Sequence, residues 1–207
     1  MTTRRRRFRG WRWVLLALAL LLPALAAGGL LAGRYAEDAL LRGASAQVES
    51  GDLEAALRTL EPLKRQRFLS REGRRRAAAL YFRLGEDKSG HALLAGIPFH
   101  EGDPEDARLR ALAARCQRAA SLLKKADAAA SPRERLRLTR AARDELPDAP
   151  DVLLRVAEAE LQAMLHSNDP AQSQAFEEAY TELRRKAPAR AAELRRRVQQ
   201  AVGTEKR

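Results

Sequence analysis

The chain has 207 residues, of which 45% are hydrophobic and 32% are charged. So many charged residues exclude a protein with several membrane spans, and a single cysteine excludes an internal disulfide or a cysteine-clustered metal centre. Basic residues outnumber acidic ones by 39 − 27 = 12, and six of the basic residues are Arg within residues 1–12, well ahead of Glu37, the first acidic residue. Half of the positive excess therefore belongs to the N-terminal tail.

An apolar segment follows this tail. Residues 14–32 contain no charge, and at about 1.5 Å per residue a helix of this length crosses a hydrocarbon core of about 30 Å. Trp11 and Trp13 precede the segment and Tyr35 follows it, where amphipathic rings favour a membrane interface. We therefore predict a transmembrane signal anchor over residues 13–33.

The basic tail, residues 1–12, sets the predicted orientation of the anchor. It holds six Arg residues, whereas only Arg34 and Arg42 follow the segment within fifteen residues. Because basic residues are retained on the cytoplasmic side, we predict a single-pass protein of the cytoplasmic membrane with a cytoplasmic N-terminus. Residues 34–207 then form an extracytoplasmic domain, in the periplasm of a bacterial cell.

Two features of the segment support other hypotheses. The apolar stretch that precedes Pro23 and residues 24–26 (Ala-Leu-Ala) is also typical of a cleaved signal peptide, whose removal leaves a secreted helical-repeat protein. Gly29 and Gly33 have the G-x-x-x-G spacing that lets two membrane helices approach closely. A homodimer through these glycines is therefore a further hypothesis.

From residue 34 onward the apolar spacing is helical, and β-branched residues are scarce. Asp or Ser followed by Pro marks helix starts at 103–104, 131–132 and 169–170. Pro62 is expected to kink or shorten its helix, and the longest break is expected from Gly96 to Gly102. We predict an all-α fold with helices over 13–49, 52–67, 71–84, 89–97, 105–129, 132–146, 150–166, 170–186 and 188–202.

A pattern repeats at an interval of 34 residues. Gly51-Asp52 and Gly85-Glu86 are each a small turn followed by an acidic helix start. This period, with small residues on both helices of a unit, is typical of stacked helix–turn–helix repeats, because small side chains let two helices approach closely. The pairs that hold the same offset are Ala44 with Ala78, Ala56 with Gly90, Leu60 with Leu94, and Leu63 with Ile97.

The stretch 50–57 (SGDLEAAL) resembles the tetratricopeptide repeat (TPR) family, and Tyr81 stands where that family favours an aromatic residue. The resemblance covers about residues 36–188. It implies that residues 34–207 form a TPR-like solenoid of antiparallel helix pairs, closed by a polar capping helix over 189–202.

The resemblance also implies a binding surface. In TPR proteins the first helix of each unit lines a concave groove, which receives an extended peptide or a partner's helix. Arg75, Ala79 and Phe82 lie at steps of four and three on such a helix. We predict that this face looks into the groove, with Arg75 available to a carboxylate. The alternative is that Phe82 packs in the core and Arg75 is merely solvated.

Residue patterns for catalysis are absent from the sequence. The three His residues are far apart, no nucleotide-binding or serine-hydrolase motif occurs, and Cys116 lies on an apolar stripe. We expect no catalytic residue, no metal and no cofactor. The basic clusters are mixed with acidic residues, so no nucleic-acid partner is expected for an exported domain.

These observations favour a non-enzymatic, membrane-tethered TPR adaptor, which helps to assemble or operate a bacterial envelope complex. Its partners would be other membrane or periplasmic proteins. The alternative is an integral accessory subunit of a larger membrane protein complex, with its single helix packed permanently among the others.

Overall fold

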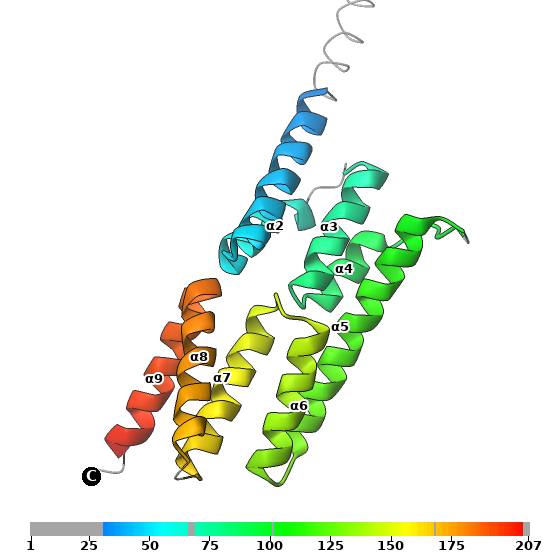
Figure 1. Cartoon of the computed structure of the whole chain (residues 1–207). Coiled ribbons are helices and arrows are strands. Elements are labelled where there is room, and N and C mark those ends of the chain that lie inside the picture. Colours follow the sequence, from blue (N-terminus) through cyan, green and yellow to red (C-terminus); the bar gives the residue numbers. More distant parts are fainter. Residues whose placement is uncertain (1–30, 66–68, 101, 168, 205–207) are drawn as a thin grey trace, which may run out of the picture. The chain divides into compact units, whose positions relative to one another are not determined.

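The computed structural model describes residues 31–65, 69–100, 102–167 and 169–204, and within these ranges every regular element is a helix (Figure 1). The predicted all-α class is confirmed for this part of the chain. A helix over 31–50 is followed by α2 (Leu53–Arg65), α3 (Arg71–Arg83), α4 (Asp87–Leu94), α5 (Pro104–Ala128), α6 (Pro132–Glu145), α7 (Pro150–Leu165), α8 (Pro170–Lys186) and α9 (Pro188–Thr204).

Contacts divide the chain after Ala39 into two units, residues 1–39 and 40–207. Most of the predicted anchor, residues 13–30, lies outside the described residues. Among the helices that are described, none is long and apolar enough to span a membrane. In the first unit, residues 31–39 are helical, and Tyr35 is 71% exposed.

The helix bounds follow local sequence signals closely. Asp103, Ser131 and Asp169 each accept a backbone N–H at the start of the helix that follows, as the predicted caps require, and Ser70 does the same at the start of α3. The α2 helix continues past Pro62 to Arg65, so this proline does not end the helix. The expected long break is present, because the chain between α4 and α5 is not helical.

Gly51 and Gly85, which are 34 residues apart, end their helices in the same way. Their φ angles are +84° and +82°, in the left-handed region that glycine adopts without steric cost. In both turns the glycine N–H donates to the carbonyl three residues earlier at 3.1 Å, and the next N–H donates to the carbonyl five residues earlier at 2.8 Å. The sequence repeat is thus also a repeat of backbone conformation.

The small residues that the repeat pairs lie inside the fold. Ala44, Ala56, Ala78 and Gly90 are all buried. A Cβ on Gly90 would lie 2.5 Å from Cε1 of Phe82, so α4 approaches α3 more closely than any other residue type allows.

Helices α3–α4, α5–α6, α6–α7 and α7–α8 pack against each other as neighbours in the chain. The long α5 helix also contacts α3 and α7, on successive parts of its length (Figure 1). Arg75 of α3 pairs with Asp106 near the start of α5, whereas Arg155 of α7 pairs with Asp127 near its end. The helices α3 and α7 therefore lie one beyond the other along α5.

The turns of several helices meet between α3 and α7. Asp148 accepts a 2.9 Å hydrogen bond from Arg83 and lies 3.6 Å from Nζ of Lys186. The Glu54 carboxylate accepts the N–H groups of Ala189 and Arg190 at 3.1 and 3.0 Å, and so caps the start of α9. We call this meeting point of the turns 51–52, 84–86, 146–149 and 187–189 the central junction.

Candidate functional site

A hollow of about 280 Å³ opens in the second unit between the N-terminal helix, α3 and α5. Its lining combines apolar side chains with several guanidinium groups, and we call it the arginine hollow. Leu41 and Leu109 are buried at 2% and 5% exposure, whereas Ala79 and Leu112 are half-buried. The charged side chains of the lining are Glu72, Arg75, Arg76, Arg83, Glu105 and Arg108.

The hollow contains two of the three groove residues that the sequence predicts. Arg75 and Ala79 line it, and helix α3 places them one turn apart. Phe82 does not line the hollow, in agreement with the alternative in which it packs in the core. Phe82 is fully buried, where its ring packs against Gly90 and edge-on to His91 with centroids 5.1 Å apart. The short turn after α3 brings α4 across this last turn of the helix and covers Phe82.

Arg75 is held in place by two carboxylates. Its side chain is only 11% exposed, and its guanidinium lies 2.7 Å from Asp106 and 3.3 Å from Asp103. Asp106 is 0% exposed and also accepts the backbone N–H of His100 at 2.7 Å. Since a buried carboxylate needs a cation beside it, Arg75 primarily neutralises Asp106 and is not free to bind a partner's carboxylate.

Asp103 links this ion pair to the start of α5. Its carboxylate accepts the N–H of Glu105 at 2.9 Å, and this hydrogen bond, with Arg75 adding to it, lowers the pKa of Asp103 below its usual value. The charge of Asp103 therefore persists to lower pH than that of an unpaired aspartate. Through these contacts Asp103 holds the chain between α4 and α5 beside the hollow.

The remaining charges of the hollow differ in their pairing. Arg83 is bound to Asp148. Arg108 is exposed and has no polar partner among the described residues, and the same holds for the carboxylates of Glu72 and Glu105. Because these unpaired charges have both signs, apolar contact and shape determine what the hollow binds more than net charge does.

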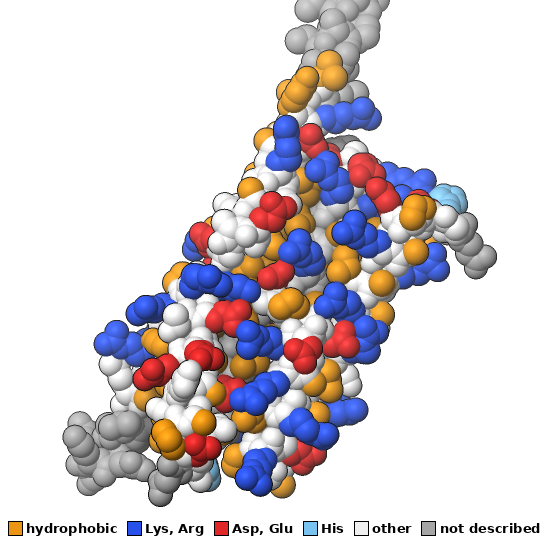
Figure 2. Space-filling view, in the orientation of Figure 1, with side chains coloured by type: hydrophobic (Ala, Val, Ile, Leu, Met, Phe, Trp, Pro, Cys, Tyr) orange, Lys and Arg blue, Asp and Glu red, His pale blue; other side chains and the backbone are white. Residues whose placement is uncertain are grey.

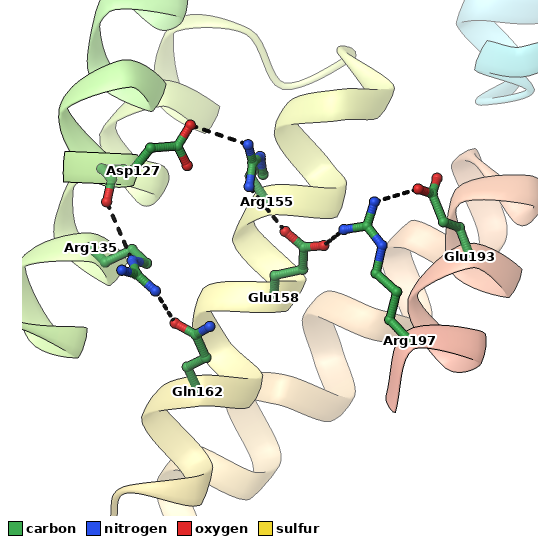
Figure 3. A network of polar contacts seen from close by, with 8 residues as sticks. Asp127, Arg135, Arg155, Glu158, Gln162, Glu193 and Arg197 are labelled. Atoms are coloured by element: carbon green, nitrogen blue, oxygen red, sulfur yellow. Dashed lines mark hydrogen bonds and ion pairs between the residues drawn. The ribbon is translucent and has the colours of Figure 1, made fainter. Parts of the chain in front are cut away.

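A second groove runs between α5, α7 and α9, and its charges bind one another. Glu158 pairs with Arg155 and Arg197, and these two arginines pair in turn with Asp127 and Glu193 (Figure 3). The network continues through Arg190, which pairs with Glu193 and Asp151. A ligand would have to displace existing ion pairs here, so this groove is a weaker candidate than the arginine hollow.

Arg135 lines a neighbouring pocket between α5, α6 and α7. It donates to the carbonyls of Ala126 and Ala129 at 3.3 Å and to the Gln162 side chain at 2.5 Å (Figure 3). These bonds connect the end of α5 to α6 and α7. Arg135 therefore has a structural role, because its guanidinium already donates hydrogen bonds to three acceptors.

The predicted membrane residues are only partly described. Trp11, Trp13 and Gly29 lie outside the described residues. Tyr35 is exposed, and nothing lies within 4 Å of the position that a Cβ on Gly33 would take. Neither the interfacial position of Tyr35 nor the dimer through Gly29 and Gly33 is tested by these contacts.

No group of His, Cys, Asp and Glu residues suited to hold a metal ion occurs in the described ranges. Cys116 is 1% exposed, and burial raises the pKa of its thiol to about 11. Such a thiol is protonated at neutral pH and unreactive, because the thiolate is the nucleophile.

Leu41, Arg108 and Leu112 line the hollow but were not among the predicted site residues. Part of the signal is in the sequence, because Arg108 and Leu112 are four residues apart and share a face of α5. Only the fold shows that this face lies beside α3.

Comparison with known proteins adds no assignment. No family model, no curated protein and no solved structure matches this chain. The site is therefore defined by its own geometry.

Proposed function

We propose that this protein is a non-enzymatic adaptor of TPR type, tethered to the cytoplasmic membrane, whose arginine hollow receives a segment of a partner protein. The hollow itself carries the proposal. Half-buried Ala79 and Leu112 offer apolar contact beside the unpaired guanidinium of Arg108, whereas the ion pairs of the second groove are already complete.

Three further observations support the proposal. Helices that follow one another in the chain pack side by side, and Gly51 and Gly85 repeat one turn geometry at the interval of a helix–turn–helix unit. The small residues that the repeat pairs are buried, and Gly90 lies against Phe82 of the neighbouring helix. The uncharged segment 14–32 and the basic tail before it favour an anchor with residues 34–207 outside the cytoplasm.

Site-specific crosslinking tests the hollow in the native membrane. A photoreactive residue at position 108 should give a discrete adduct with one protein, whereas the same residue at Arg137, exposed on α6, should not. Ala79→Glu should abolish the adduct, since it places a charge on the apolar lining. An adduct at 137 and none at 108 would place the binding surface elsewhere.

Topology and the mode of association are tested separately. A reporter that is active only outside the cytoplasm, fused after Arg207, should be active, and a silent but well-expressed fusion contradicts the proposed orientation. The mass of the mature chain distinguishes an anchor from a cleaved signal peptide. Stoichiometric association that persists in detergent at high salt indicates a permanent subunit rather than an adaptor.

A further inference from the structure

The segment between α4 and α5 exposes an aromatic side chain beside two arginines. Phe99 is 41% exposed, and the Arg110 guanidinium lies 5.8 Å from the centre of its ring. Arg71 donates a 3.0 Å hydrogen bond to the carbonyl of Pro98. Arg110 donates to the carbonyls of His100 and Asp106. We call Arg71, Phe99 and Arg110 the Phe99 patch.

No described carboxylate is paired with the two guanidinium groups of the patch. Both bind backbone carbonyls, and neither forms an ion pair with a carboxylate among the residues that the structure describes. They differ in this from Arg75, which is neutralised by Asp106. An exposed ring with one such cation beside it, and a second bound to the preceding residue, suits a surface that is anionic outside and apolar beneath.

The Phe99 patch lies at the end of the second unit where the chain enters it. From Leu40 the N-terminal helix leads to the turn at Gly51 in the central junction, and from Arg71 helix α3 leads to the turn at Gly85 in the same junction. These stretches are similar in length, about 16 and 20 Å, and both contribute to the arginine hollow. Arg71 is therefore at the same end as Leu40.

Residues 34–39 connect the proposed anchor to the second unit, and the length of this tether limits how far this end can be from the bilayer. If the anchor ends at residue 33, as the proposed function requires, only residues 34–39 separate it from Leu40. Six residues span at most about 20 Å. The end of the second unit that carries the Phe99 patch then lies close to the membrane surface.

We propose that the Phe99 patch docks on anionic lipid headgroups, with Arg71 and Arg110 binding phosphate groups and the Phe99 ring entering the interface. This inference rests on the anchor of the proposed function. Figure 2 shows Lys, Arg and His side chains beside hydrophobic ones, with acidic side chains among them, where α5 begins. Docking would hold the arginine hollow near the bilayer and restrict its partners to proteins that reach the membrane surface.

Leu165 provides a matched control at the opposite end of the second unit. It is 72% exposed and ends α7, which starts at the central junction and extends away from α3. The two helices together place it about 40 Å from Arg71. An aromatic residue at this position cannot reach the membrane if the Phe99 patch is docked.

The test uses the full-length chain in lipid vesicles. Trp11 and Trp13 are replaced by Phe, and either Phe99→Trp or Leu165→Trp provides the fluorescent probe. Vesicles contain brominated acyl chains and either phosphatidylcholine alone or an equal mixture with phosphatidylglycerol. We expect emission of the Phe99→Trp probe to fall about twofold in the anionic vesicles and little in the neutral ones, because basic side chains are attracted to anionic headgroups.

Charge variants show whether the arginines are responsible. Arg71→Gln or Arg110→Gln should each shift the equilibrium between docked and undocked probe by about fivefold, since one basic residue near an anionic surface contributes about 1 kcal/mol. Arg133→Gln, on the exposed face of α6, should have no effect. High salt should release the Phe99→Trp probe, because it screens the headgroup charge.

Several outcomes would overturn the inference. Equal quenching in neutral and anionic vesicles would exclude headgroup charge, and no quenching in either would exclude docking. Quenching of the Leu165→Trp probe would show that another end faces the bilayer. A chain that does not incorporate into vesicles at all contradicts the anchor, and hence the proposed function, rather than the Phe99 patch alone.

Discussion

Gly90 of α4 faces the ring of Phe82 on α3 so closely that a Cβ at position 90 would lie 2.5 to 2.7 Å from three ring carbons. Phe82 is 0% exposed and packed on every side, so the ring has little room to move. The glycine thus sets the distance between two helices of a pair. Ala56, which is 34 residues earlier, is the equivalent small residue of the preceding pair.

Gly90→Ala should therefore destabilise the domain although alanine favours helices. We expect a loss of about 1–3 kcal/mol in the free energy of unfolding, since overpacking outweighs the gain in helix propensity. Urea unfolding of residues 34–207 measures it, with Arg137→Ala as a control that changes stability by less than about 0.5 kcal/mol. Combining Gly90→Ala with Phe82→Leu should restore part of the loss, and strictly additive effects would show that the two residues do not interact.

The contact between Gly90 and Phe82 shows how far sequence reasoning extends. The 34-residue interval identifies Gly90 as a residue of close helix contact and Gly51 and Gly85 as turn residues. Both assignments can be made from the sequence, because a close contact and a tight turn each require a small residue at one position. The same reasoning assigned Phe82 to the groove, since helical periodicity gives the residues that share a face but not what covers that face. Only the position of α4 shows that Phe82 is buried.

The ion pair between Arg75 and Asp106 could not be predicted for a similar reason. These residues are 31 positions apart on different helices, and each looks like an ordinary surface charge in the sequence. The bond between Glu54 and the start of α9 joins residues 135 positions apart. Such contacts depend on how distant helices pack together, and no local sequence pattern predicts that packing.

Substitutions at Arg75 and Arg108 should distinguish an effect on the stability of the fold from an effect on partner binding. Arg75→Leu leaves the buried Asp106 carboxylate without its cation, and we expect a loss of about 3–5 kcal/mol in the free energy of unfolding. Arg108→Leu removes an exposed group with no described polar partner and should change stability by less than about 0.5 kcal/mol.

The two variants are compared by urea unfolding and by crosslinking from position 79. Arg108→Leu should weaken the adduct without affecting the fold. If Arg75→Leu is as stable as the parent, Arg75 is not the partner that Asp106 requires.

Acid should weaken the domain through carboxylates that are paired in the folded state. Arg118 binds the two oxygens of Glu145 at 3.0 and 2.9 Å and lowers its pKa, and Arg190 lowers the pKa of Glu193 through a side-chain hydrogen bond. A carboxylate with a lowered pKa contributes stability above its unfolded pKa, and this contribution is lost as the pH falls through its folded pKa. The urea midpoint should therefore begin to fall below about pH 4.5.

Single substitutions test the assignment of this pH dependence. Glu145→Gln should flatten the decline of the urea midpoint between about pH 4.5 and 3, because one of the titrating groups is gone. Glu177→Gln, an exposed side chain with no polar partner among the described residues, should leave the profile unchanged. Equal effects of the two variants would mean that Arg118 does not perturb Glu145.

Glu54 caps a helix that begins 134 residues later, and its removal should loosen that helix locally. The start of α9 follows Ala187, which has no side-chain acceptor, so the Glu54 carboxylate supplies the acceptor that an ordinary N-cap residue would provide. Its negative charge also favours the positive end of the helix dipole. We expect Glu54→Ala to cost about 0.5–2 kcal/mol and to speed amide hydrogen exchange at residues 189–192. Glu54→Gln, which retains an acceptor, should cost less, and Glu49→Ala near the preceding turn should leave α9 protected. Unchanged exchange at these amides in Glu54→Ala would show that α2 and α9 are not joined by this contact in solution.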